Sequence, residues 1–212
     1  MKLQLRNLLA AVAGLVMCLG GAIGATDAQF NAANQVFQRA NSGDKSAVDE
    51  AVSKFGDLVR AEPTNPVLLV HLGAATSMQA RNTMLPWKKI SYAEDGMALE
   101  DKAIALLTAE HDKQVQNGVP VSLFVRYVTA NTFLAVPRFF NRAASGEKLL
   151  NEVLASPLFE ASPLHFKGNV WVRAAKFATE EKRPDDARKY LDLVIKSGAP
   201  QADAAKAQLA AM

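Results

Sequence analysis

The chain has 212 residues, half of them hydrophobic, and its 24 basic and 21 acidic residues leave a net charge of +3. Without Lys2 and Arg6 at the start of the chain the net charge is only +1, and no basic block with interleaved aromatic residues occurs. The composition therefore does not indicate a nucleic-acid-binding protein. The only cysteine is Cys18, so a chain cleaved after that position has no thiol chemistry and no cysteine-ligated zinc.

The first 25 residues have the pattern of a secretory signal. A basic start is followed by an uncharged apolar stretch, Leu8 to Gly24, which ends in small residues. We expect cleavage after Ala25, so that residues 26–212 form one exported domain, with the periplasm as its destination. The alternative is an uncleaved segment that anchors the chain in a membrane, although this stretch is shorter than the about 20 residues that a span needs.

Everything after this segment is predicted to be helical, because no sustained alternation of β-branched residues occurs. Apolar residues at helical spacing predict helices over about residues 30–40, 48–58 and 66–82. Asn65 is placed to cap the third of these helices, with Pro66 at its first position.

The next segment, about residues 86–112, forms either one long helix or two pieces, because Gly96 weakens it. Asn117-Gly118 follows a helical stretch and is interpreted as a helix stop, not as a hairpin turn. Further helices are expected over about residues 119–134 and 138–154.

The sequence of the C-terminal part predicts three more helices. Ser162 is expected to cap a helix that carries Trp171, and Pro184 begins the next one. Ser197-Gly198 ends that helix, and a short last helix over residues 201–211 has the position of an end cap.

Two stretches carry the spacing of a known repeat. One, in chain order, consists of Trp171, Ala174, Ala175, Ala178, Ala187 and Leu191; the other consists of Ala51, Phe55, Pro63, Leu69, Leu72, Gly73 and Thr76. Both resemble the tetratricopeptide signature, with substitutions at several of its positions. The resemblance implies an all-α solenoid of antiparallel helix hairpins, about four helix pairs plus a C-terminal capping helix. It also implies that Gly73 and Ala175 lie where two helices cross closely.

The middle of the chain departs from this pattern. Leu69 and Trp171 lie three 34-residue periods apart. The predicted helices, however, account for a distance of only two helix pairs between these positions. The central helices or loops are therefore expected to be longer than those of the family, and a specialised surface is most readily placed there.

The resemblance implies a binding scaffold whose partner is another protein or a peptide, docked in a mildly basic groove or through the region of Trp87. In the family, the first helix of each pair lines a concave peptide-binding face. By family spacing this face consists of Val70, His71, Ala74, Ser77, Met78 and Arg81 in one repeat, and of Asn169, Val172, Arg173, Lys176 and Thr179 in another. Such a face suits an acidic segment or a terminal carboxylate.

Two further clusters stand out because tryptophan, tyrosine and arginine are typical interface anchors. The first is the segment from Leu85 to Tyr92, and the second is spread over residues 126–142, where one of the adjacent Phe139 and Phe140 is expected to be exposed. The plainer alternative is that the aromatic side chains pack the core and the cations are merely solvated. The residues predicted to bind the partner are Arg81, Trp87, Lys88, Lys89, Tyr92, Arg126, Tyr127, Arg173 and Lys176.

No catalytic, cofactor-binding or metal-binding residue is predicted. The three histidines, His71, His111 and His165, are scattered, and neither a metalloprotease motif, a nucleophile elbow nor a phosphate-binding glycine loop occurs. Two alternatives to the adaptor hypothesis stay open. One is a small-ligand-binding protein with a pocket near Trp87, Tyr92 and Tyr127, and the other is a subunit of a cell-envelope complex.

Overall fold

The computed structural model describes residues 27–212, so the predicted signal segment lies outside the described residues. Helices dominate this part of the chain, as the sequence predicts, and the α-helices alone account for most of it. They are α1 (Asp27–Asn41), α2 (Ser46–Ala61), α3 (Pro66–Asn82), α4 (Pro86–Ala105), α5 (Val121–Ala135), α6 (Ala143–Ala155), α7 (Pro157–Glu160), α8 (Leu164–Glu180), α9 (Pro184–Ser197) and α10 (Ala202–Ala210).

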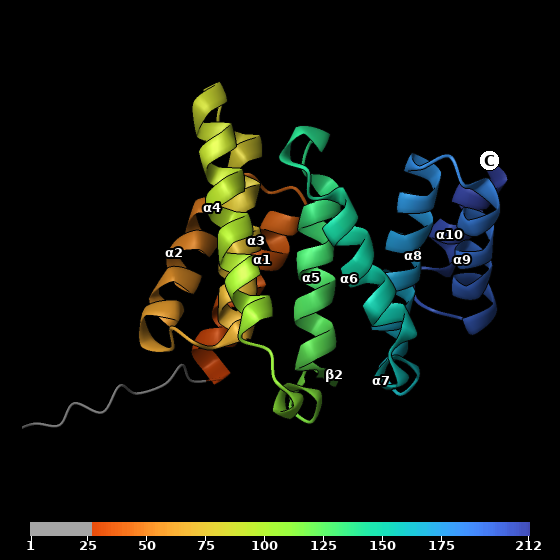
Figure 1. Cartoon of the computed structure of the whole chain (residues 1–212), viewed down its shortest axis with the longest axis horizontal. Helices are drawn as coiled ribbons and strands as arrows, with labels where there is room; N and C mark the ends of the chain where they lie inside the picture. The colour runs from red at the N-terminus through yellow and green to blue at the C-terminus, as the bar shows by residue number, and fades with distance from the viewer. Residues whose placement is uncertain (1–26) are drawn as a thin grey trace, which may run out of the picture.

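In chain order the helices form the pairs α1–α2, α3–α4, α5–α6 and α8–α9, with α10 against α9, and α2 packs on α3 at least as closely as on α1. Along the longest axis of the molecule, α1 to α4 gather at one end, α5 and α6 lie in the middle, and α8 to α10 lie at the other end (Figure 1). Helix α7 is a single turn between the third and fourth pairs. None of the helices in residues 27–212 is both long enough and apolar enough to cross a membrane.

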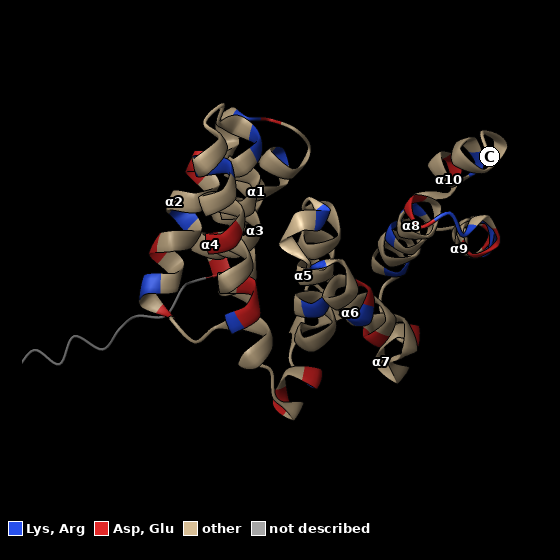
Figure 2. Cartoon of the chain, turned by 45° about the horizontal axis from the view of Figure 1, so that its top comes forward, with Lys and Arg blue, Asp and Glu red and all other residues tan. Residues whose placement is uncertain are grey.

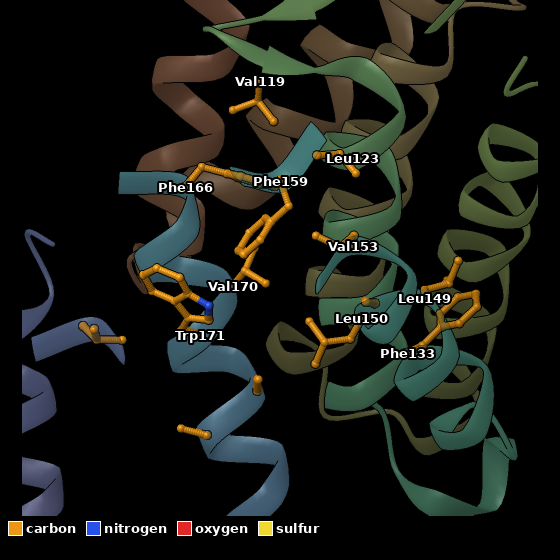
Figure 3. Packing of buried hydrophobic residues seen from close by; sticks show 14 of the residues in the cluster. Val119, Leu123, Phe133, Leu149, Leu150, Val153, Phe159, Phe166, Val170 and Trp171 are labelled. Carbon is orange, nitrogen blue, oxygen red and sulfur yellow. The ribbon is translucent and has the colours of Figure 1, made fainter. Parts of the chain in front are cut away.

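The core is divided among neighbouring helices. The N-terminal part centres on Phe55 and the C-terminal part on a larger cluster that runs from α4 to α10. In that larger cluster, Phe159 of the short α7 points between α5 and α8 (Figure 3). Its ring meets Trp171 edge to face, with the ring centroids 5.8 Å apart. Trp171 and the alanines of its repeat signature are buried, as expected.

Helices α3 and α4 touch through their backbones. A Cβ atom added to Gly73 would lie 2.7 Å from the carbonyl oxygen of Gly96, and one added to Gly96 would overlap Ser77. The predicted close crossing at Gly73 is confirmed. Gly96 therefore has a packing role, because α4 continues through it without a break from Pro86 to Ala105.

The long segment after α3 does not divide at Gly96, which was the expected reason for two pieces, but it does end short of residue 112. Helix α4 ends at Ala105, and a short 3-10 turn, η1 (Ala109–Asp112), follows. The interpretation of Asn117-Gly118 as a helix stop is wrong. Both residues have positive φ angles, 52° and 78°, and they form the two-residue turn of a small hairpin, β1 (Val115–Gln116) with β2 (Val119–Pro120). Positive φ at both positions is what this dipeptide favours in a tight hairpin.

Two helix starts also differ from expectation. Ser162 does not cap α8: its hydroxyl donates to the carbonyl of Leu158, and Pro163 precedes the helix. The helix expected to begin at residue 138 begins at Ala143, after a separate 3-10 turn, η2 (Arg138–Phe140). The cap at Asn65 is confirmed, because its side chain accepts from the first turn of α3.

Candidate functional site

The first predicted cluster lies where α3 turns into α4, at an end of this hairpin that projects beyond the neighbouring helices (Figure 1). Arg81, Lys88 and Lys89 are exposed there, Trp87 is 65 % exposed, and Tyr92 is half-buried one turn further along α4. The structure thus brings these five predicted residues together. Three more exposed apolar side chains join them: Met84, Leu85 and Ile90.

The second predicted cluster is held in ion pairs. Arg126 donates from Nε to Glu152 at 3.2 Å and from Nη1 to the carbonyl of Ser122. Arg142 makes two bonds to the carboxylate of Asp101, at 2.7 and 3.2 Å. These arginines tie helices to one another, so Arg126 is not a free binding residue.

Of the two adjacent phenylalanines, Phe139 is 64 % exposed and Phe140 packs on the core, which confirms the expectation for this pair. The centroids of their two rings lie 4.3 Å apart. Arg138, beside them in η2, is paired with Glu181 at the end of α8.

Tyr127 of α5 and Arg173 of α8 belong to different helix pairs but lie close enough for each to influence the pKa of the other. Tyr127 packs edge to face on Phe166, with a centroid distance of 5.3 Å, and its hydroxyl is hydrogen-bonded to Asn131. Burial raises the pKa of Tyr127, while Asn131 and the charge of Arg173 act in the opposite direction. Burial likewise lowers the pKa of Arg173, against the attraction of Glu180 and Tyr127. The sequence named both residues but did not place them together.

Arg173 is only 8 % exposed, and its Nε and Nη2 atoms are buried without a hydrogen-bond partner within the described residues. One turn along α8, Lys176 is exposed and lies 4.0 Å from the carboxylate of Glu180. Elsewhere, Lys and Arg are interspersed with Asp and Glu along the helices (Figure 2). A buried arginine with two donor atoms that lack hydrogen-bond partners, as Arg173 has, is unusual in a protein interior.

The predicted concave face on α3 is wrong for most of its members. Val70, His71, Ala74 and Met78 are buried, so they form core and do not line a groove. His71 lies in an aromatic box, 4.6 Å from the ring of Phe55, and its Nδ1 bonds the carbonyl of Val67 at 2.7 Å. The family spacing did not predict that these residues are buried, because α1, α3 and α5 approach closely here and fill the space between them.

One buried acid was missed altogether. Glu100 of α4 is fully buried and accepts a 2.6 Å hydrogen bond from Thr132 of α5, while its other oxygen has no partner in the described part of the chain. Burial raises its pKa well above the ordinary value. Its spacing from Ala93 and Met97, on the buried stripe of α4, is the signal that could have revealed it.

The described surface has open cavities. One, of about 600 Å³, lies beside Phe30, Asn65 and His111, and another, of about 560 Å³, lies beside Arg126 and Glu152. Trp87, Tyr92 and Tyr127 line neither of them. Among residues 27–212, no group of three His, Cys, Asp or Glu side chains is arranged to hold a metal ion.

Comparisons with protein-family models, with curated proteins and with solved structures found no match to this chain. Two surfaces have the chemistry of a binding site: the end of the α3–α4 hairpin and the neighbourhood of Arg173.

Proposed function

We propose that the chain is an exported, tetratricopeptide-like adaptor that binds an acidic segment of a partner protein between α5 and α8. The order of the helices supports the repeat interpretation: four closely packed pairs are followed by α10, in the place of a terminal cap. The small residues of the signature also lie in the core, at Ala175, Ala178 and Ala187.

The observation that carries the proposal is the environment of Arg173. Burying a cation costs several kcal/mol unless its donors are hydrogen-bonded, and the attraction of Glu180 still leaves two donor atoms of Arg173 without a partner in the described chain. The guanidinium has unpartnered donors at Nε and Nη2. A carboxylate satisfies two such donors at once, because its two oxygens match the planar fork of arginine.

The groups around Arg173 suit the same ligand. Tyr127 and Asn131 supply hydroxyl and amide groups from α5, and Lys176 adds an exposed cation on α8. Because these donor atoms are buried, an acidic side chain or a chain-terminal carboxylate would pair with Arg173 only as α5 and α8 move apart to admit it. Lys176 would then contact the flanking residues of the bound segment.

The test is a titration of a fluorescent, Asp- and Glu-rich peptide with a free C-terminus, followed by anisotropy. Replacing Arg173 by Gln should weaken binding at least tenfold, because a hydrogen bond to a charged group contributes about 1.5–3 kcal/mol. The matched control is Lys189→Gln, which removes an exposed cation on α9 that has no ion pair within residues 27–212. This variant should bind as the parent does.

Two comparisons complete the test. A peptide with Gln and Asn in place of its acids reports side-chain recognition, and an amidated peptide reports recognition of the terminal carboxylate. Equal binding by the parent and Arg173→Gln would refute the proposal. A permanent envelope-complex subunit would differ by copurifying with its partner in a fixed ratio.

A further inference from the structure

The end of the α3–α4 hairpin has a composition unlike the rest of the surface. We define the α3–α4 tip as residues 79–93. Four of its apolar side chains point into solvent, at exposed fractions of 39 to 87 %. These are Met84, Leu85, Trp87 and Ile90. Exposed apolar residues are ordinary when single, but a group of this size on a projecting end marks an interaction site.

All charged side chains of the tip are also basic. Residues 79–93 contain Arg81, Lys88 and Lys89 and no Asp or Glu. Most Lys and Arg residues of the described part are in ion pairs, but none of the pairs found within residues 27–212 includes these three. All three are exposed to solvent and are therefore available to an anionic surface that approaches the tip.

The tip is held firmly by the helices below it. Asn82 donates to the carbonyl of Lys45 at 3.0 Å, and Gln79 donates to Asp49 at 2.7 Å. Backbone contact between Gly73 and Gly96 locks the two helices further down. The apolar side chains are thus presented on a preformed, protruding support.

Neighbouring loops lie at the same edge of the molecule. The Asn82 bond places the α1–α2 loop beside the tip, and η2 with the exposed Phe139 lies at the same end of the next helix pair (Figure 1). The pair Arg138–Glu181 then joins η2 to the end of α8. The edge thus offers a row of loops with a second exposed aromatic ring.

We propose that this edge, led by the α3–α4 tip, docks on an anionic lipid bilayer, with Trp87 in the interfacial layer. A convex apolar end enters a bilayer surface without a complementary groove, whereas a protein partner would have to supply one. Tryptophan and tyrosine favour the membrane interface, and each Lys or Arg near an anionic leaflet adds attraction. Lys88 and Lys89 reach the headgroups while their alkyl chains remain against the apolar layer. The inference is independent of peptide binding at Arg173.

The test uses the purified mature protein with sedimentable vesicles of phosphatidylcholine, either alone or with 30 % phosphatidylglycerol. The parent should partition onto the anionic vesicles and dissociate as salt is added. The double variant Lys88→Gln, Lys89→Gln should partition roughly 30-fold less. The control Lys189→Gln removes one exposed cation on α9 and should partition as the parent does.

Trp87 supplies a second, spectroscopic readout. The chain has two tryptophans, and Trp171 is 8 % exposed while Trp87 is 65 % exposed. Anionic vesicles should shift the parent's emission to the blue, and lipids brominated on their chains should quench it. Trp87→Phe should keep the partitioning and lose the spectral change.

Three results would overturn the inference: no partitioning of the parent, equal partitioning of the Lys88, Lys89 double variant, or an unchanged spectrum of bound parent. If the double variant bound vesicles as the parent does but lost a protein partner, the tip would be a protein-binding surface and not a membrane-binding one. None of these results bears on the Arg173 titration, so the two proposals fail separately.

Discussion

Within residues 27–212, His71, Glu100 and Arg173 are buried ionisable side chains, and their surroundings differ. His71 is surrounded by aromatic rings and bonded to a carbonyl of its own helix. Glu100 has one hydrogen bond, to Thr132, and one free oxygen. Arg173 has buried donors with no partner in the described chain. The first two can be explained as structure, because each titrates toward its neutral form when buried. Arg173 stays charged, and this is why we connect it with a ligand.

Glu100 should make stability fall as pH rises. Its folded-state pKa lies well above the ordinary 4.5, so the folded chain holds a proton that the unfolded chain releases. The stabilisation is complete below about pH 4.5 and is lost as pH rises through the raised pKa, at up to about 1.4 kcal/mol per pH unit. Replacing Glu100 by Gln should remove this dependence, as measured by urea unfolding between pH 4 and 8.

Asp101 and Arg142 also face this acid and act on its pKa in opposite directions. The suitable control is Glu94→Gln, an exposed change on the same helix, which should leave the pH profile unaltered. A constant stability difference between parent and Glu100→Gln across that range would contradict the assigned burial.

His71 should have the opposite effect on the acid side. Burial lowers its pKa to about 4 from 6.5, so the unfolded chain binds a proton that the folded chain refuses. Its contribution is complete above pH 6.5 and is lost as pH falls toward 4, by roughly 3 kcal/mol. His71→Phe should flatten this part of the stability profile, while the exposed His165→Phe should not. If both variants keep the parent's acid dependence, another group is responsible.

At the scale of elements, the α3–α4 hairpin depends on two glycines that face each other. A methyl group on Gly96 would overlap Ser77 and the Gly73 carbonyl, so the helices would have to separate. Gly96→Ala should destabilise the protein by about 1–3 kcal/mol, measured by urea unfolding. Gly56→Ala, inside α2, meets only the flexible Arg60 at 3.7 Å and should stabilise by up to about 1 kcal/mol. Equal effects of both changes would mean that the crossing is not tight.

The elements that the sequence predicted well are those with long apolar stripes and a local cap. Asn65 with Pro66 gives one such start, and its bonds are all within the first turn. The errors occurred where the deciding contacts lie outside the local sequence. Ser162 has the right position for a cap, yet its hydroxyl bonds back to Leu158. Asn117-Gly118 forms a hairpin whose strands are only two residues long, too short to give an alternating pattern.

At the scale of the whole molecule, residue type and family spacing each pointed to part of the candidate sites. Trp87 and its two lysines stood out by composition, and they do lie together in solvent. The concave face failed at Val70 and Ala74, because spacing along one helix does not reveal how closely the next helix approaches. Tyr127 was named for its residue type and Arg173 by family spacing, but their proximity depends on how the third and fourth helix pairs pack.

The two proposed surfaces together describe an adaptor with separate roles for its parts. The edge led by the α3–α4 tip would rest on a bilayer, while the α5–α8 surface would hold an acidic segment of a partner. The tip is on the second helix pair and Arg173 is on the fourth. One molecule of this protein could therefore contact a bilayer and hold a partner segment at the same time.

Site-specific photo-crosslinking tests the partner site most directly. A photoreactive residue is placed at Lys176, one turn from Arg173, or at Lys189 on α9, and cells are irradiated before the envelope fraction is analysed. We predict a discrete crosslinked partner from position 176 that disappears when Arg173→Gln is added, and no such product from position 189. A product from position 176 that persists in the Arg173→Gln background, or one formed only at position 189, would contradict the account.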